Sequence, residues 1–398
     1  MTDKPLCVPN GFRFGGVIAG IKKSGKPDIS LIVGDQPLVA AGVYTTNQIV
    51  AAPVVWCRRN TPSQSVRAVI ANSGNANACT GEQGDADTAE MCQRVADALG
   101  CDASDVLVMS TGVIGNLLPM EKVRSGIDDV LQKLDTGVDA FVSAAQAIMT
   151  TDKSRKTCSR QLQIADQTIT ITAMAKGAGM IAPNMATMLS VVTTDAKLTP
   201  EQATRLLKQA ADGSYNRVSV DGHASTNDTL LLLASGQVGE LLSGKDETTF
   251  ANCLNELCVE IARELVADGE GATHWMKICV SGAQCDRDAE LIARTVGASP
   301  LVKTAITGAD PNWGRIVSAV GYAGPPIEPT KTCLTLCGVL IYENGRPLPY
   351  DAASLSKTMS QSPEVLVELI VGSGSGAGVH WASDLTTTYV TFNSEYTT

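Results

Sequence analysis

A single threonine, Thr187, stands where a polar turn runs into a strand-like segment. The turn contains Pro183-Asn184, a dipeptide typical of chain reversal, and residues 190–194 have the composition of a strand. A threonine hydroxyl is a weak nucleophile until a base removes its proton. If the chain were cut directly before Thr187, the new α-amine, with an ordinary pKa of about 8, would supply that base. Thr187 is therefore either a structural strand-entry residue or a nucleophile released by cleavage.

The glycine-rich segment upstream of Thr187 carries one cation. Lys176 opens the sequence Lys-Gly-Ala-Gly at residues 176–179, and it is the only lysine or arginine between Arg160 and Lys197. The glycines allow a ligand or another backbone segment to approach closely. Lys176 is therefore either solvated or a partner for an anionic group such as the carboxylate of a small substrate.

Two further turns carry groups that suit acyl chemistry. Ser110-Thr111-Gly112 follows an apolar segment, and backbone N–H groups with a hydroxyl at such a turn can hold a developing oxyanion. Glu270 lies in a turn of small residues after a helical pattern, where it is either solvated or available to a cationic substrate group. Each turn also has an ordinary structural interpretation.

Alternating strands and amphipathic helices must position these residues. Hydrophobic periodicity predicts helices over 87–99, 119–134 and 250–265, and Thr199-Pro200 predicts another helix start. Residues 162–174 predict a hairpin, and the residues from Asn72 to Asn77 predict a polar turn. Further strands are predicted over 67–71, 106–109, 190–194, 339–341 and 365–371. The chain is therefore α/β to its end, with an internal boundary near 285–330.

Composition limits the classes of function. A chain of 398 residues has room for two domains, and its net charge of −10 disfavours nucleic acid as a partner. Twelve cysteines occur without a CxxC pair and with only three histidines, which argues against a zinc site. No signal peptide or membrane-length apolar stretch is apparent, so we expect a protein of the reducing cytoplasm.

Five segments together resemble the ornithine acetyltransferase (ArgJ) family of arginine biosynthesis. The resemblance extends from Gly11 to the C-terminus, and so covers nearly the whole chain. The segments that carry it are 72–81 (Asn-Ser-Gly-Asn-Ala-Asn-Ala-Cys-Thr-Gly), 110–115 (Ser-Thr-Gly-Val-Ile-Gly), 176–189, 308–316 and 393–398.

This resemblance implies a self-cleaving enzyme. Cleavage between Ala186 and Thr187 would give an α chain, 1–186, and a β chain, 187–398. Thr187 would then be the catalytic nucleophile, and Thr111 and Gly112 would form the oxyanion hole. The residues expected to contact substrate are Thr151, Lys176, Thr187, Glu270, Asn393 and Thr398.

The implied reaction transfers acetyl from N²-acetyl-ornithine to glutamate through an acetyl-Thr187 intermediate, in a ping-pong sequence. The donor carries an α-carboxylate and a δ-ammonium, so Lys176 and Glu270 are candidates to meet them, in an order that the sequence leaves open. The exchange requires no metal and no cofactor, and acetyl-CoA is an additional acetyl donor in some family members.

The resemblance also implies an architecture and an assembly. The expected fold is a layered α/β sandwich resembling N-terminal-nucleophile hydrolases with different connectivity, plus a smaller α/β C-terminal part. Two α and two β chains are expected to assemble, with neither nucleic acid nor membrane as a partner.

The chain departs from the family pattern at two places, and two other functions stay open. The chain reads His223-Ala224 where members usually have Asp-Thr, and it has Thr397 where an arginine usually precedes the last threonine. An amidohydrolase or aminopeptidase with the same N-terminal nucleophile is the enzymatic alternative, in which water accepts the acyl group. A binding paralogue without activity is the non-enzymatic one.

Overall fold

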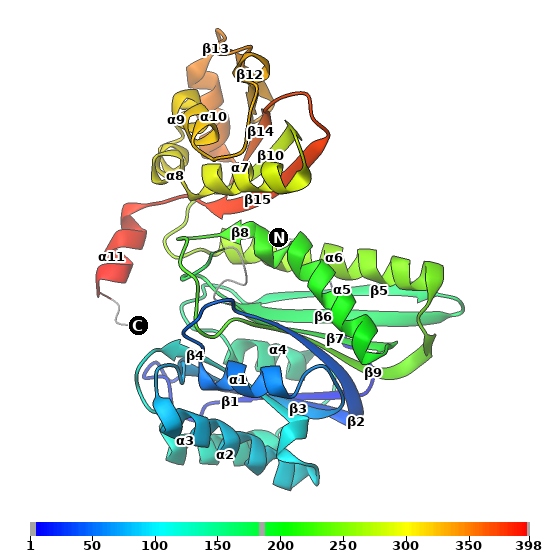
Figure 1. Cartoon of the computed structure of the whole chain (residues 1–398). Coiled ribbons are helices and arrows are strands. Elements are labelled where there is room, and N and C mark those ends of the chain that lie inside the picture. The colour runs from blue at the N-terminus through cyan, green and yellow to red at the C-terminus, as the bar shows by residue number, and fades with distance from the viewer. Residues whose placement is uncertain (1–4, 183–187, 396–398) are drawn as a thin grey trace.

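Two mixed β-sheets form the framework of the protein. The computed structural model describes residues 5–182 and 188–395. Figure 1 shows a larger unit, coloured from blue to green, with a smaller α/β unit coloured from yellow to red stacked on it. The predicted layered α/β architecture with a smaller C-terminal part is therefore confirmed.

The larger sheet has the strand order β4-β3-β2-β9-β7-β6-β5, and β1 pairs with β2. Strand β3 is parallel to β4, and β7 is parallel to β9, whereas the pairs β2–β9 and β6–β7 are antiparallel. The strands are β1 (Phe12–Val17), β2 (Ile29–Tyr44), β3 (Ser63–Asn75), β4 (Val106–Val113), β5 (Lys156–Ile164), β6 (Gln167–Lys176), β7 (Leu189–Lys197) and β9 (Thr229–Leu241).

Helices cover both faces of this sheet (Figure 1). The helices are α1 (Ala52–Arg59), α2 (Gly81–Leu99), α3 (Met120–Gln132), α4 (Val138–Ala147), α5 (Pro200–Gly213) and α6 (Gly244–Ala267). Helix α3 packs against Gly15 of β1 and α4 against the adjacent Gly16, so these two helices lie on opposite faces at β1. Helices α5 and α6 pack against β9 from the side of Leu230 and Leu232. Strand β9 divides its side chains between the two cores: Leu231 and Leu233 pack on one side, and Leu230 and Leu232 on the other. Successive strand residues face opposite sides, so a sheet buried on both faces needs an unbroken apolar run.

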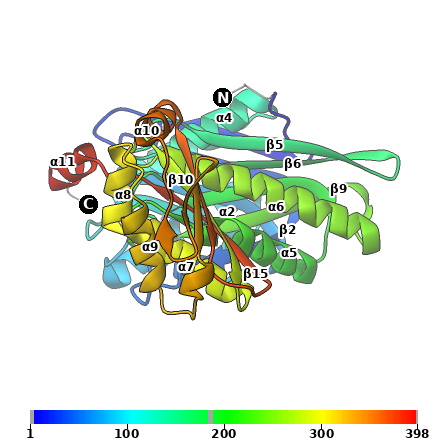
Figure 2. The ribbon, with the colours of Figure 1, turned by 90° about the horizontal axis from the view of Figure 1, so that it is seen from above.

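The smaller sheet has the order β13-β12-β11-β14-β10-β15-β8. Its strands are β8 (Val218–Ser219), β10 (Trp275–Ala283), β11 (Cys333–Leu336), β12 (Val339–Glu343), β13 (Arg346–Pro347), β14 (Glu364–Ile370) and β15 (Gly376–Ser383). Its helices are α7 (Asp286–Ala298), α8 (Pro300–Thr307), α9 (Trp313–Gly321) and α10 (Ala352–Gln361). Figure 2 shows these helices over one end of the larger sheet, with the β5–β6 hairpin projecting at the other end. The last helix, α11 (Thr387–Glu395), extends away from the smaller unit beside the larger one.

The structure confirms the predicted helices and strands and corrects two turns. Ser110-Thr111-Gly112 was predicted as a turn, but β4 continues through Val113. Asn72 to Asn77 was predicted as a turn, but β3 continues through Asn75, and its parallel ladder with β4 pairs Asn72 with Ser110. The polar strand end is stable because its side chains bond internally: Asn72 Nδ2 donates to Asn75 O at 2.8 Å, and Ser110 Oγ donates to Asn72 Oδ1 at 2.6 Å.

No helix within residues 5–182 and 188–395 is both long enough and apolar enough to cross a membrane.

Candidate active site

Several strand ends meet at one edge of the larger sheet and enclose a cavity of about 300 Å³. The carboxyl ends of β4 and β6 reach this edge, and the turn after α6 and helix α11 close it from the side of the smaller unit. Six residues predicted from the sequence line the cavity together: Thr111, Gly112, Thr151, Lys176, Glu270 and Asn393. Residues separated by up to 282 positions in the sequence thus share one pocket.

The predicted oxyanion residues lie at the end of β4. Gly112 has a φ of +133°, and a Cβ atom there would lie 2.3 Å from the carbonyl carbon of Gly74. The close approach of β3 therefore requires glycine at this position. Thr111 is 5% exposed, and its Oγ1 atom accepts a hydrogen bond from Lys176 Nζ at 3.2 Å. The polar backbone at the end of β4 and a hydroxyl therefore face the cavity, as an oxyanion site requires.

Lys176 ends β6 inside the protein and is only 3% exposed. Burial lowers the pKa of Lys176, although the nearby Asp152 carboxylate partly opposes the shift. The described residues form no ion pair with it, so its ammonium faces the cavity with a neutral hydroxyl as its hydrogen-bond partner. A desolvated cation in this position is suited to bind an anionic group of a ligand.

Glu270 is held opposite by two other residues predicted to contact substrate. Thr151 Oγ1 donates to its Oε1 atom at 2.7 Å, and Asn393 Nδ2 donates to Oε2 at 3.1 Å. The Glu270 amide donates to Ala178 O at 2.8 Å, and a Cβ atom at Gly179 would lie 2.4 Å from Oε2. The glycine segment after Lys176 therefore makes room for this carboxylate, and the cavity carries opposite charges.

Three predicted site residues, Ala186, Thr187 and Thr398, lie outside the described residues. The chain is described again from Met188, whose N–H donates to Asp228 Oδ1 at 3.1 Å. Strand β7 then begins at Leu189, which pairs with Lys176 across the β6–β7 ladder. Met188 is 2% exposed, so the chain segment directly after Thr187 is anchored in the protein beside the cavity.

Residues 221–228 contribute contacts that the sequence interpretation missed. Asp221 accepts hydrogen bonds from Met180 N at 2.6 Å and Tyr389 Oη at 3.2 Å, and Asn227 Nδ2 donates to Ser110 O at 2.9 Å. The polar character of 221–228 and the departure from the family pattern at 223–224 pointed to this segment, but they did not identify its partners, which lie 41 to 168 residues away in the sequence.

Asp228 and His223 occupy contrasting positions in the same segment. Asp228 is buried, burial raises its pKa well above the usual range, and its Oδ2 atom has no partner among the described residues. His223 lines the cavity but is exposed, so the departure from the family pattern lies at the mouth.

Comparison with known proteins finds relatives along nearly the whole chain. The model of the ArgJ family matches residues 13–398. The arginine biosynthesis bifunctional protein ArgJ of Rhodopirellula baltica is 56% identical, with 98% of this chain and 96% of that protein covered. The protein of the same name from Nitratidesulfovibrio vulgaris is 47% identical, with 98% of each covered. A crystal structure of arginine biosynthesis bifunctional protein ArgJ from Bacillus halodurans is 33% identical with a TM-score of 0.51, covering 52% of this chain and 98% of that one. This chain belongs to the ArgJ family.

Proposed function

We propose that this chain is an acetyltransferase of arginine biosynthesis that cleaves itself between Ala186 and Thr187 and then uses Thr187 as its nucleophile. The observation that carries the proposal is the shared cavity. Lys176, Glu270, Thr111 and Gly112 line it, and the strand that follows Thr187 begins beside it. These are the charges and the oxyanion donors that acetyl exchange between amino acids requires.

Acetyl transfer follows from the chemistry of an N-terminal threonine. The Thr187 hydroxyl attacks the acetyl carbonyl of N²-acetyl-ornithine while its own α-amine takes the hydroxyl proton. The tetrahedral oxyanion is stabilised at Thr111 and Gly112, and it collapses as the ornithine amine leaves with a proton. The amine of glutamate then attacks the carbonyl of acetyl-Thr187 by the same steps in reverse. Acetylglutamate leaves, and the Thr187 hydroxyl regains its proton.

Substrate selection rests on the two charges of the cavity. The buried Lys176 ammonium suits the α-carboxylate that donor and acceptor share, because it is desolvated and lacks an ion-pair partner among the described residues. Glu270 suits the ornithine ammonium, and Thr151 and Asn393 orient its two oxygens. Thr398 would add a further contact to the substrate.

Self-cleavage would begin with attack of the Thr187 hydroxyl on the Ala186 carbonyl. An ester forms as the peptide C–N bond breaks and the amine takes a proton, and water then hydrolyses the ester. The Bacillus halodurans chain supports such processing in a relative, because 98% of it corresponds to only 52% of this chain. A chain of about half length is what a cut near residue 187 would leave.

Denaturing electrophoresis of the purified, folded protein tests the cleavage. We expect two bands of similar size from the wild type and one full-length band from Thr187→Ala, which should also be inactive. A single full-length band from active wild-type protein would rule out cleavage as the source of the nucleophile.

Acetyl acceptor and donor assays test the transfer. Incubation with N²-acetyl-ornithine and glutamate should yield acetylglutamate in excess of acetate. Release of acetate alone would favour the amidohydrolase alternative, and the absence of both products would favour a binding paralogue. Replacing the donor by acetyl-CoA decides whether this chain also acetylates glutamate directly, and no cofactor should be needed for the exchange.

We further propose that the enzyme works in the cytoplasm as an assembly of two α and two β chains. The mass of the native particle, measured by light scattering, tests the assembly. We expect about twice the 41.5 kDa of the single chain.

A further inference from the structure

A buried ion triad lies directly behind the residues proposed to bind substrate. Lys156, at the start of β5, is fully buried, and its Nζ atom lies 2.5 Å from Asp152 Oδ1 and forms a second ion pair with Asp268 Oδ2. Asp152 precedes β5 in the chain, and Asp268 caps the C-terminus of α6. Two segments of the chain, residues 152–156 and the end of α6, therefore meet at one ammonium group.

Each carboxylate of the triad also holds backbone groups next to a cavity residue. Asp152 accepts hydrogen bonds from Thr150 N at 2.9 Å and from Gly177 N at 2.6 Å, so it fixes the neighbours of Thr151 and Lys176. Asp268 accepts one from Lys153 N at 3.0 Å, and it lies two residues before Glu270. The triad thus connects the segments that carry Thr151, Lys176 and Glu270.

The charge of the triad also suits its neighbour. Burial alone would raise the pKa of Asp152, but the ammonium groups of Lys156 and Lys176 lower it to about 2. Two carboxylates and one ammonium leave a net charge of −1 beside the buried Lys176. Burial lowers the pKa of Lys176. Within the triad, Asp152 raises that pKa and so favours the charged form of Lys176, whereas Lys156 lowers that pKa.

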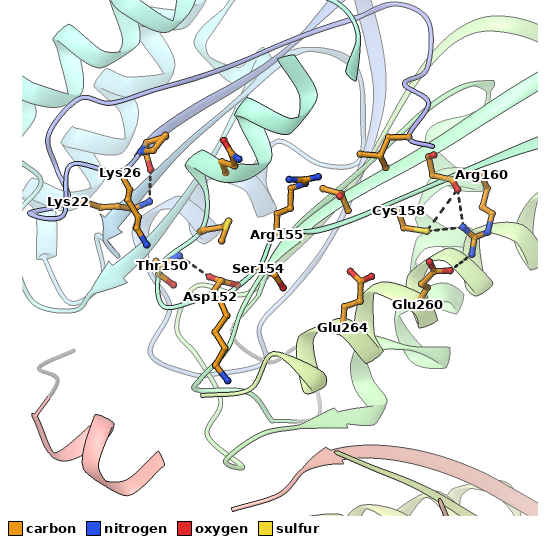
Figure 3. A pocket seen from close by; sticks show the side chains of 17 residues that line it. Lys22, Lys26, Thr150, Asp152, Ser154, Arg155, Cys158, Arg160, Glu260 and Glu264 are labelled. Atoms are coloured by element: carbon orange, nitrogen blue, oxygen red, sulfur yellow. Dashed lines mark hydrogen bonds and ion pairs between the residues drawn. The ribbon is translucent and has the colours of Figure 1, made fainter. Parts of the chain in front are cut away.

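The triad does not line the cavity of the candidate site. Asp152 instead borders a second cavity of about 650 Å³, drawn in Figure 3, where Lys22 and Lys26 lie on one side and Glu260 and Glu264 on the other. Thr150, whose N–H donates a hydrogen bond to Asp152, borders both cavities. The triad therefore offers no surface to a substrate in the candidate site. Its effect on that site passes through the backbone groups that it holds.

We infer that Asp152, Lys156 and Asp268 are positioning residues that hold Thr151, Lys176 and Glu270 at the spacing that the amino-acid substrate requires. This inference rests on the proposed function. The triad sets the distance between the cationic and anionic ends of the cavity, and so contributes to the choice of ligand length.

Substrate kinetics of Asp152→Asn test this role. Asparagine keeps the shape of the side chain but places an NH₂ donor against Thr150 N or Gly177 N, both of which are donors. Because these contacts orient binding groups, we expect KM for N²-acetyl-ornithine to rise roughly 10- to 100-fold while kcat changes less than about 3-fold. Lys156→Met should have the same signature.

A destabilised variant remote from the site separates positioning from general loss of structure. Leu334→Ala removes a fully buried side chain from the core of the smaller unit. At a temperature where equal fractions of each variant are folded, Leu334→Ala should keep the wild-type KM. An unchanged KM in both triad variants, or an equal rise in Leu334→Ala, would overturn the inference.

Calorimetric binding of ornithine gives a readout that does not depend on turnover. The dissociation constant of the triad variants should rise by the same factor as KM. Wild-type protein that binds ornithine without exchanging acetyl would refute the proposed transfer alone. Wild-type affinity in the triad variants would refute the positioning role alone, and wild-type protein that does neither would refute both.

Discussion

Replacing Lys176 with methionine should separate the stability of this protein from its activity. The two side chains have similar length, but methionine lacks the ammonium group that lies buried at the end of β6. In the proposed complex this ammonium binds the substrate carboxylate. Loss of one buried, charge-assisted contact costs about 2 to 4 kcal/mol, and at 1.36 kcal/mol per tenfold change kcat/KM should fall roughly 30- to 900-fold.

The stability of the same variant should move in the opposite direction or remain unchanged. Burial lowers the pKa of Lys176 in the folded state, so folding of the wild type is disfavoured by the proton that this side chain carries. Because the unfolded chain binds that proton more readily, wild-type stability should rise relative to Lys176→Met as the pH approaches the ordinary lysine value near ~10.5. Below the folded-state pKa, the methionine variant should have an equal or higher melting temperature.

The assay combines exchange kinetics with urea unfolding at several pH values. Lys197→Met serves as the matched control, because it removes the charge of an exposed lysine at the end of the neighbouring strand β7. The control should retain wild-type activity and stability. The reasoning would be refuted if Lys176→Met kept full activity, or if it unfolded more readily than the wild type at neutral pH.

Three further variants probe separate features. Gly112→Ala places a Cβ atom 2.3 Å from the Gly74 carbonyl carbon at a φ of +133°, so it should lower stability by about 3 kcal/mol in thermal unfolding; Gly115→Ala, where nothing lies within 4 Å, controls for the positive φ. Glu270→Gln should raise KM for N²-acetyl-ornithine about 10-fold without changing the melting temperature, and an unchanged KM would place the ornithine ammonium elsewhere. Burial lowers the pKa of His380 to about 3, so the neutral form is favoured in the fold. Its contribution to stability is complete above the ordinary value of about 6.5 and declines by up to about 5 kcal/mol as the pH falls to 3. Urea unfolding of His380→Leu should show a shallower decline over that range, and an identical pH profile would contradict this assignment.

The sequence predicted most of the secondary structure because local patterns control it. Thr199 was expected to begin a helix. In the structure its hydroxyl accepts a hydrogen bond from the Gln202 N–H in a capping box, and Pro200 lies in the first turn. The helix predicted over 250–265 is the buried stripe of the longer α6. The hairpin at 162–174 also matches β5 and β6, because strand period and turn chemistry lie within a few residues.

The site residues were predicted only in part, for a different physical reason. The residue types of Lys176, Glu270, Thr111 and Gly112 are compatible with acyl chemistry, and the family resemblance implied their roles. The supporting contacts do not: Lys156 reaches Asp268 across 112 residues, and Asn227 reaches Ser110 across 117. Such pairs depend on the order of strands in the sheet, which local periodicity does not specify. The Asn72–Asn75 error has the same origin, because polar residues there satisfy one another along a neighbouring strand.

The strand order has a consequence for how two cleaved chains would stay together. Strands β7 and β9, from the second half of the chain, are inserted between β2 and β6 from the first half. One ladder joins Ile171 through Lys176 to Thr194 through Leu189, and another joins Val39 through Tyr44 to Ala234 through Thr229. A cut before Thr187 would therefore leave two polypeptides interlocked through a common sheet, inseparable without melting it. The two halves should co-purify and unfold as one cooperative unit. A β chain made alone would lack β2 and β6, the strands that flank its own β9 and β7.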